Sequence, residues 1–251
     1  MSFTTWTPPA LLSKSRQWRG DIWRMVDAQY TAGGMKLVDT REEQDILDTL
    51  LQESLPALPE IFRKLDPLLA APFRSCTLRA GSRFRAASDP GVFYGATAVD
   101  TACAEMGYWR WKFLYDALDM PDIKPIAHTA FKSEVATLAI DLRDPAFKHD
   151  ENHWQHKSSY TATQALARTA RTAHLGAICY ASARDPQQGE CAALLTPAAF
   201  ASVTPHPVKQ TWWLVVRRAE VIWRCDSRAL VFSAQPWQES LTSQVTLKEN
   251  A

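Results

Sequence analysis

The stretch from residue 98 to 118 constrains the fold most, because it predicts one long helix in the middle of the chain. It contains no proline and a single glycine, and most of its residues are good helix formers. Just before it, VFYGA at 92–96 is a short apolar and aromatic run that is typical of a buried strand. A strand that leads directly into a long helix indicates a fold in which both kinds of element pack together.

More strands and helices are expected around this pair. They are interspersed without a strict βαβ repeat, which predicts the α+β class with a mixed or antiparallel sheet. In chain order they are a hairpin or two edge strands over 126–142, a helix over 158–174 capped by Ser158 or Ser159 and ended by Gly176, strands at 177–182 and 191–195, and one or two strands over 211–225.

The first 70 residues predict a helical N-terminal extension. A proline pair precedes apolar residues at helical spacing over 9–32, and two further helices are expected after Asp39 or Thr40 and over 60–70. The expected division is therefore an extension over 1–70, a strand-containing domain over 71–240 and a polar tail over 241–251.

Composition excludes several classes of protein. The formal net charge of the 251-residue chain is +1, which argues against binding nucleic acid as the main activity. No apolar run approaches the roughly 18 residues of a membrane span, and the N-terminus does not resemble a signal peptide. The five cysteines are far apart and form no CxxC pair, which indicates reduced thiols in the cytoplasm. P-loop, GxGxxG and GxSxG motifs are absent.

Glu105 is the first candidate for chemistry. At helical spacing it shares a face with Ala98, Ala102, Trp109 and Phe113. A carboxylate on such a face costs free energy unless it finds hydrogen-bond donors. The pattern leaves two interpretations open: a boundary acid paired with Arg110 or another cation, or a carboxylate that points into a cleft beside Tyr94.

Arginines and a late serine add to this candidate. Arg74, Arg79, Arg83 and Arg85 lie close together, and Arg83 and Arg85 alternate in what is expected to be extended chain, so both would point to one face. Arginines that face a cleft can bind a diphosphate through paired hydrogen bonds, although any single one is more often a solvated surface residue. Ser182 is predicted at the junction of a strand and a turn, where serine is usually only a turn residue.

A competing signal is the segment HDENHWQH, which contains His149, His153 and His156. On a helix, two of these histidines could meet one metal ion, as in a metal-dependent hydrolase. The segment is not HExxH, and a polar, solvated connection explains it better than a metal site does.

Five short motifs in order resemble the RES-domain toxins, a family named for an arginine, a glutamate and a serine. The resemblance extends from about residue 20 to 205 and is greatest with the longer ParT-like branch, which has a helical N-terminal extension. The motifs are PFRS, GSRF, a Gly-Val-aromatic-Tyr strand, TAxAE at the start of a helix, and YASARDP.

The resemblance implies a fold similar to that of ADP-ribosyltransferases, with a split sheet, in which 71–240 is the catalytic domain. It implies an enzyme that consumes NAD as its substrate, needs no metal and inhibits bacterial growth as the toxin of a type II toxin–antitoxin pair. The implied partner is a cognate antitoxin with an Xre-like DNA-binding region and a toxin-binding C-terminal region; neither nucleic acid nor membrane is expected to bind the toxin directly.

Carried over to this sequence, the resemblance assigns catalysis to Glu105, Arg74 and Tyr94. Binding of NAD falls to Arg74, Tyr94 and Ser182 together with Arg83 or Arg85. The chain departs from shorter members at Arg85, so Arg83 and Arg85 remain alternatives for contacting the diphosphate.

The implied chemistry suits these residue types. Cleavage of the nicotinamide–ribose bond passes through an oxocarbenium-like state, which a nearby carboxylate such as Glu105 stabilises. Tyr94 would stack on nicotinamide. The acceptor of ADP-ribose (a protein, phosphate or water) stays open, as do a metal-dependent hydrolase and a non-catalytic interaction domain as alternatives.

Overall fold

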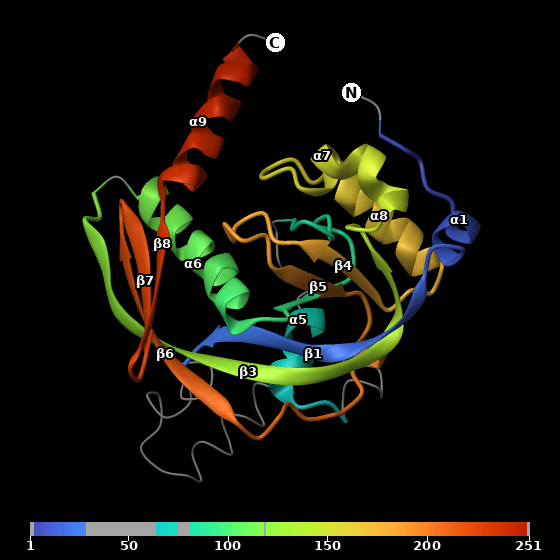
Figure 1. Cartoon of the computed structure of the whole chain (residues 1–251), viewed down its shortest axis with the longest axis horizontal. Coiled ribbons are helices and arrows are strands. Elements are labelled where there is room, and N and C mark those ends of the chain that lie inside the picture. The colour runs from blue at the N-terminus through green and yellow to red at the C-terminus, as the bar shows by residue number, and fades with distance from the viewer. Residues whose placement is uncertain (1–2, 29–63, 75–80, 118, 250–251) are drawn as a thin grey trace.

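The computed structural model describes residues 3–28, 64–74, 81–117 and 119–249, and its arrangement is shown in Figure 1. One mixed sheet of eight strands organises these residues. The strands are β1 (Arg16–Asp27), β2 (Phe93–Ala96), β3 (Asp122–Asp141), β4 (Ala177–Ala181), β5 (Glu190–Leu194), β6 (Lys209–Arg217), β7 (Glu220–Cys225) and β8 (Arg228–Ser233).

Helices cover this sheet. The long helix α6 (Val99–Asp116) contacts β1, β2, β6 and β7, and α9 (Gln235–Glu249) projects from the end of β8 (Figure 1). The remaining helical segments are α1 (Pro8–Leu12), α5 (Pro67–Arg74), α7 (Glu151–Trp154), α8 (Thr161–Thr172) and the 3-10 turns η1 (Pro145–Asp150) and η2 (Pro197–Ala199).

The sheet divides into two groups of strands that share β3. The N-terminal half of β3 pairs with β6, which continues through β7 to β8. The C-terminal half pairs with β1 on one edge and, in parallel, with β4 on the other. The pairings β4–β5, β5–β2 and β2–β1 then close a ring of strands. The predicted α+β class with a mixed, split sheet is confirmed.

Side chains from both faces of the strands are buried, which explains the continuous apolar runs in β4 and β5. In β4, Ile178 and Tyr180 face one hydrophobic cluster, whereas Ala177 and Cys179 face another. The first cluster also contains Trp111 of α6 and Trp223 of β7, both fully buried. The tryptophans of α6 and β7 therefore anchor this helix to the sheet.

The helix predicted over 9–32 is wrong for the described residues of that range, which end at residue 28: a helix covers Pro8–Leu12, and Arg16–Asp27 is a strand of the sheet. The apolar residues Trp18, Ile22 and Val26 are four apart, a spacing that places them on one face of either a helix or a strand. The segment is a strand because β1 pairs with β3 along its whole length, which satisfies its backbone hydrogen bonds. The helix expected after Asp39 lies outside the described residues, and the domain boundary near residue 70 stays a prediction.

The hairpin or edge strands predicted over 126–142 are also wrong, because β3 is a single central strand of 20 residues. The segment has no turn signal, and an unbroken strand satisfies its backbone through neighbours on both edges. Pro125 lies where the register with β6 shifts, as expected for a residue that cannot donate a backbone hydrogen bond.

The other predicted elements are close to the observed ones. The helix over 98–118, the strand over 92–96 and the strands over 177–182 and 191–195 are confirmed. Helix α8 lacks the predicted serine cap: Tyr160 occupies the N-cap position without a side-chain hydrogen bond. Strand β8 was not predicted, and α9 is helical through Glu249, where a polar tail was expected.

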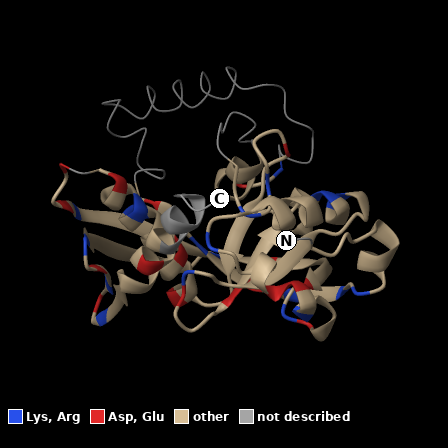
Figure 2. Cartoon of the chain, turned by 90° about the horizontal axis from the view of Figure 1, so that it is seen from above, with Lys and Arg blue, Asp and Glu red and all other residues tan. Residues whose placement is uncertain are grey.

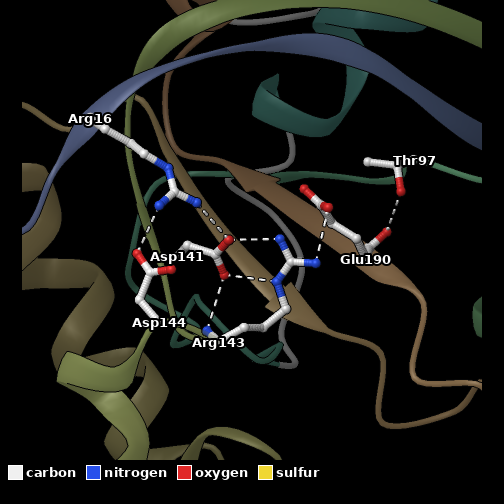
Figure 3. Close-up of polar contacts among 6 residues, drawn as sticks. All are labelled: Arg16, Thr97, Asp141, Arg143, Asp144 and Glu190. Atoms are coloured by element: carbon white, nitrogen blue, oxygen red, sulfur yellow. Dashed lines mark hydrogen bonds and ion pairs between the residues drawn. The ribbon is translucent and has the colours of Figure 1, made fainter.

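An ion-pair network joins the end of β3 to β1 and β5 (Figure 3). Arg143 donates to Asp141 at 2.6 Å and pairs with Glu190 at 2.9 Å. Arg16 bridges Asp141 and Asp144 at 3.1 and 3.0 Å. Elsewhere acidic and basic residues are interspersed along the ribbon (Figure 2). Over the part of the chain that the structure describes, no helix has both the length and the apolar character needed to cross a membrane.

Candidate active site

A cavity of about 230 Å³ opens between β1, β2 and α6. Its charged lining residues are Arg24, Arg83, Arg184 and Glu105. Aromatic and sulfur-containing side chains form most of the remaining wall. They are Trp23, Met25, Tyr94, Met106, Trp109, Tyr160, Tyr180 and Cys191.

Glu105 points into this cavity from α6. Ala102 and Trp109, predicted on the same helix face, also line the cavity, whereas Phe113 is exposed to solvent. Arg110 pairs with Asp27 instead of Glu105. Of the two interpretations of Glu105, the structure therefore supports the carboxylate in a cleft.

Ser182 holds this carboxylate in place. Its Oγ donates to Glu105 Oε1 at 2.6 Å and accepts from the backbone N–H groups of Arg184 and Asp185 at 3.1 and 3.0 Å. Ser182 is itself buried and is not part of the cavity wall. The serine therefore connects the turn after β4 to the carboxylate.

Tyr94 places its ring in the cavity wall and uses its hydroxyl elsewhere. The hydroxyl oxygen accepts from the backbone N–H of Phe84 at 3.0 Å and lies 2.8 Å from Ser82 Oγ. Burial raises the pKa of Tyr94, against the opposing effect of these hydrogen bonds. A neutral phenol thus fixes the turn 82–85 beside the cavity.

Arg83 and Arg85 point in different directions. Residues 82–85 form a turn closed by a bridge between Ser82 and Arg85, so the extended conformation predicted for them is wrong. Gln164 donates to both backbone carbonyls that flank the turn, those of Ser82 and Arg85, which fixes this conformation. Arg83 reaches the cavity, whereas Arg85 is buried outside its lining.

The structure describes only part of Arg74 and none of Arg79, the other two arginines considered from the sequence. Arg74 is the last residue of α5, and its side chain lies outside what the structure describes, as does the whole of Arg79.

Sequence reasoning missed several cavity residues, above all Arg184, Arg24 and Tyr160. Arg184 is part of the YASARDP motif, two residues after Ser182, so the motif could have identified it. Arg24 was assigned to a helix, and only its place in β1, opposite β2, brings it to the site. Tyr160 lies between helices in a segment that carried no motif.

Cys191 lies at the cavity wall as a protonated thiol. Burial raises its pKa well above the ordinary value, and the charge of Glu105 adds to the effect. A protonated, buried thiol is a weak nucleophile. Cys191 is therefore a poor candidate for the reacting group in this cavity, and the carboxylate of Glu105 is the better one.

The three histidines of the alternative metal site do not form a ligand set. Within the ranges that the structure describes, no three His, Cys, Asp or Glu side chains are placed to hold a metal ion. His153 packs against the ring of Phe3, with ring centroids 5.8 Å apart. His156 Nδ1 accepts from the backbone N–H groups of Ser158 and Ser159 at 3.2 and 2.8 Å.

Comparison with known proteins relates the chain to one family. Residues 57–217, more than half of the chain, match the RES domain. No curated protein matches it. Among solved structures, a chain of the M. tuberculosis MbcT–MbcA toxin–antitoxin complex aligns at 12% identity and a TM-score of 0.41, covering 91% of this chain and 95% of that one. On the match over residues 57–217, this protein belongs to the RES-domain family.

Proposed function

We propose that this protein consumes NAD by cleaving its nicotinamide–ribose bond and passes ADP-ribose to a protein, phosphate or water. The observation that carries the proposal is the placement of Glu105: among the described residues that line the cavity it is the one carboxylate, and the other charged side chains there are arginines. Family membership over residues 57–217 supports the same activity.

The chemistry requires little beyond positioning and charge. When the C1′–N bond breaks, its electron pair moves to the ring nitrogen and nicotinamide leaves as a neutral molecule, so no general acid is needed. The ribose then carries positive charge, which the carboxylate of Glu105 stabilises across the cavity. An acceptor oxygen or nitrogen bonds to C1′ and releases its proton.

Other residues would position the substrate. Ser182 donates to one oxygen of Glu105 and so orients the carboxylate toward the ribose. The ring of Tyr94 offers a flat apolar surface to nicotinamide. Arg83 takes the diphosphate in preference to Arg85, because only Arg83 lines the cavity. Arg74 remains a proposed contributor on the sequence resemblance alone.

We further propose that the protein acts in the cytoplasm as the toxin of a toxin–antitoxin pair and is neutralised by an antitoxin with a DNA-binding region. Membership of the RES-domain family supports this role. The four cysteines that the structure describes are unpaired, which fits a reducing compartment.

Incubation of the purified protein with NAD tests the proposal, with nicotinamide and ADP-ribose products followed by mass spectrometry. Release of nicotinamide is the expected result. An ADP-ribose mass addition to a protein would identify a transferase, whereas free or phosphorylated ADP-ribose would identify water or phosphate as acceptor. If no NAD is lost with any acceptor, and none is lost in cells that express the protein, the proposal is wrong.

A further inference from the structure

Strand β8 is an open edge of the sheet, far from the cavity wall in the strand order. It is the last strand in the order β1-β2-β5-β4-β3-β6-β7-β8, and among the described strands it pairs with β7 alone. At the other end of this order the strands close a ring, since β1 pairs with both β2 and β3. An edge strand presents a row of unpaired backbone groups to which another chain can add a strand.

Every second residue of β8 directs its backbone N–H and C=O groups away from β7. The N–H of Ala234 donates to the carbonyl oxygen of Ala219 at 2.9 Å, and in an antiparallel ladder such hydrogen-bonded pairs recur at every second residue. The even-numbered residues of β8 therefore bond to β7. The odd-numbered ones, Ala229, Val231 and Ser233, direct their backbone groups to the open edge, where no described residue forms a hydrogen bond with them.

This strand lacks the features that usually keep an edge from pairing. Arg228–Ser233 reads RALVFS, with no proline, lysine or acidic residue, and its register with β7 has no bulge. Its one charged residue, Arg228, forms an ion pair with Asp100 of α6 at 2.7 Å. Helix α9 follows β8 but is held on the α6 side of the sheet, because Trp237 packs against Trp111. Among the described residues the edge is thus left uncovered.

The face of β8 that points away from α6 ends in an exposed apolar side chain. Val231 is 60% exposed. It lies opposite Ile222 of β7, which in turn lies opposite Val215 of β6. These three β-branched side chains form one row across the strands, and cross-strand pairs of this kind stabilise sheets. The row stops at the open edge with its most exposed member, so another apolar side chain beside Val231 would extend it.

We propose that a second copy of this chain adds its own β8 to this edge, antiparallel and about a two-fold axis at Val231. Val231 then lies opposite the partner's Val231, and Ala229 lies opposite the partner's Ser233. These are the residues whose backbone groups point outward. Since each hydrogen-bonded pair exchanges two bonds, the three pairs form about six bonds, and no other antiparallel register pairs all three residues. The inference goes beyond the proposed function and does not depend on it.

The side chains fit the same register. The apolar row continues from Val231 to the partner's Val231 and on through the other sheet. In the flanking rows, Arg224 lies opposite Ala229 and Glu220 lies opposite Ser233. Arg224 and the partner's Glu220 therefore fall in one row with two small residues between them, so the charges along this row are opposite in sign. Because each copy uses its β8 edge once, the assembly closes at two copies.

Sedimentation of the whole protein at a series of concentrations tests the dimer. Two paired strands of six residues make a small interface, of the class that gives weak complexes, so a Kd in roughly the micromolar range is expected. Val231→Lys brings two lysines side by side at the axis and should weaken the dimer at least about 10-fold. Val208→Lys makes the same change at a valine that is 61% exposed and lies outside the strands, and this matched control should dimerise as the wild type does.

Two further measurements guard against a variant that does not fold. Val231→Thr keeps the β-branched shape and the backbone groups and should leave Kd within about threefold. In the wild type, hydrogen exchange followed by NMR should slow at least about 10-fold at Ala229, Val231 and Ser233 when the protein is concentrated well above Kd, with no change at Val208.

Several results would overturn the dimer. They are a protein that stays monomeric up to about 1 mM, a folded Val231→Lys variant with the Kd of the wild type, an assembly that grows beyond two copies, and a dimer in which the three outward amides of β8 stay unprotected. Each of these concerns β8 alone, so loss of the dimer would leave the proposed cleavage of NAD untouched, and failure of NAD cleavage would leave the dimer untouched.

Discussion

At the scale of single residues, Ser182 has two tasks that one hydroxyl performs together. It accepts two backbone N–H groups of the turn after β4, and it donates to Glu105 Oε1. Serine at a strand end is usually only a turn residue, and Ser182 is that as well. Its position in sequence predicted the turn; only the fold brings the side chain of Glu105, 77 positions away, into contact with it.

Ser182→Ala should therefore affect both stability and activity. Two backbone donors lose their acceptor, which should lower the free energy of unfolding by about 1–3 kcal/mol in urea denaturation. The carboxylate loses its orientation, so kcat for nicotinamide release should fall roughly 10- to 100-fold with little change in KM. Ser13→Ala, whose hydroxyl donates only to Ala10 in an exposed turn, is the control. Wild-type kcat in Ser182→Ala would contradict the positioning role.

Arg83 and Arg85 of the SRFR motif show why alternating positions alone do not predict which side chains share a face. Alternating positions in a strand share a face, but Tyr94 and Gln164 hold these residues in a turn. Tyr94 lies in the next strand, and Gln164 is 82 and 79 positions from the two residues to which it donates, so the sequence of the SRFR segment itself did not distinguish a turn from a strand. Which arginine reaches the cavity could not be predicted for that reason.

At the scale of elements, the position of α6 over the sheet determines where Glu105 lies. Gly107, two residues after Glu105, faces β7: a Cβ atom there would lie 3.0 Å from Val221 Cγ1 and 3.1 Å from Trp223 Nε1. The indole N–H of Trp223 also donates to the carbonyl oxygen of Cys103 at 3.1 Å. The absence of a side chain at residue 107 allows this close approach.

Gly107→Val should consequently push α6 away from β7. Overpacking at a filled contact lowers the free energy of unfolding by about 1–3 kcal/mol, which a urea titration would measure. Lys112→Val introduces the same side chain at a partly exposed position of α6 and serves as the matched control. A Gly107→Val protein at least as stable as this control would show that the contact is not tightly packed.

The local sequence pattern predicted α6, β2, β4 and β5 well. In these segments the spacing of apolar residues and the positions of glycine and proline indicate the same element. Local pattern failed for β1 and β3, the two longest strands, because each is stabilised as a strand by its hydrogen bonds to the other. The apolar residues of 16–27 have the spacing of a helix, and those of 122–141 have a spacing that does not distinguish one strand from two. Tertiary pairing overrides such propensities, and one sequence alone does not display it.

At the scale of the whole molecule, the network around Asp141 joins β1, β3 and β5, the strands that form much of the ring (Figure 3). Burial alone would raise the pKa of Asp141, but hydrogen bonds from Arg143 and the charges of Arg143 and Arg16 outweigh it and lower the pKa below the ordinary 3.8. A carboxylate whose pKa is lower in the folded state stabilises that state while it is ionised.

The stabilisation by Asp141 should thus be complete above pH 3.8, its unfolded pKa, and should disappear as the pH falls through the lower folded value. Urea denaturation of wild type and Asp141→Asn as a function of pH measures it. The two proteins should differ by about 1–3 kcal/mol near neutral pH and converge in acid. A difference that stays constant to the lowest pH would contradict ionic stabilisation by this residue.

The proposed function depends on all three scales: Glu105 lines a cavity between β1, β2 and α6, where we propose that it faces the ribose of NAD. The most direct test is the rate of nicotinamide release from NAD by wild type, Glu105→Gln and Asp116→Asn, with folding checked by thermal denaturation. Asp116 is an exposed carboxylate at the other end of α6, so its variant controls for the loss of one charge from the same helix. We predict that Glu105→Gln folds but releases nicotinamide at least about 100-fold more slowly, as for other losses of transition-state charge stabilisation, while Asp116→Asn matches the wild type. Release by Glu105→Gln at the wild-type rate would contradict the account.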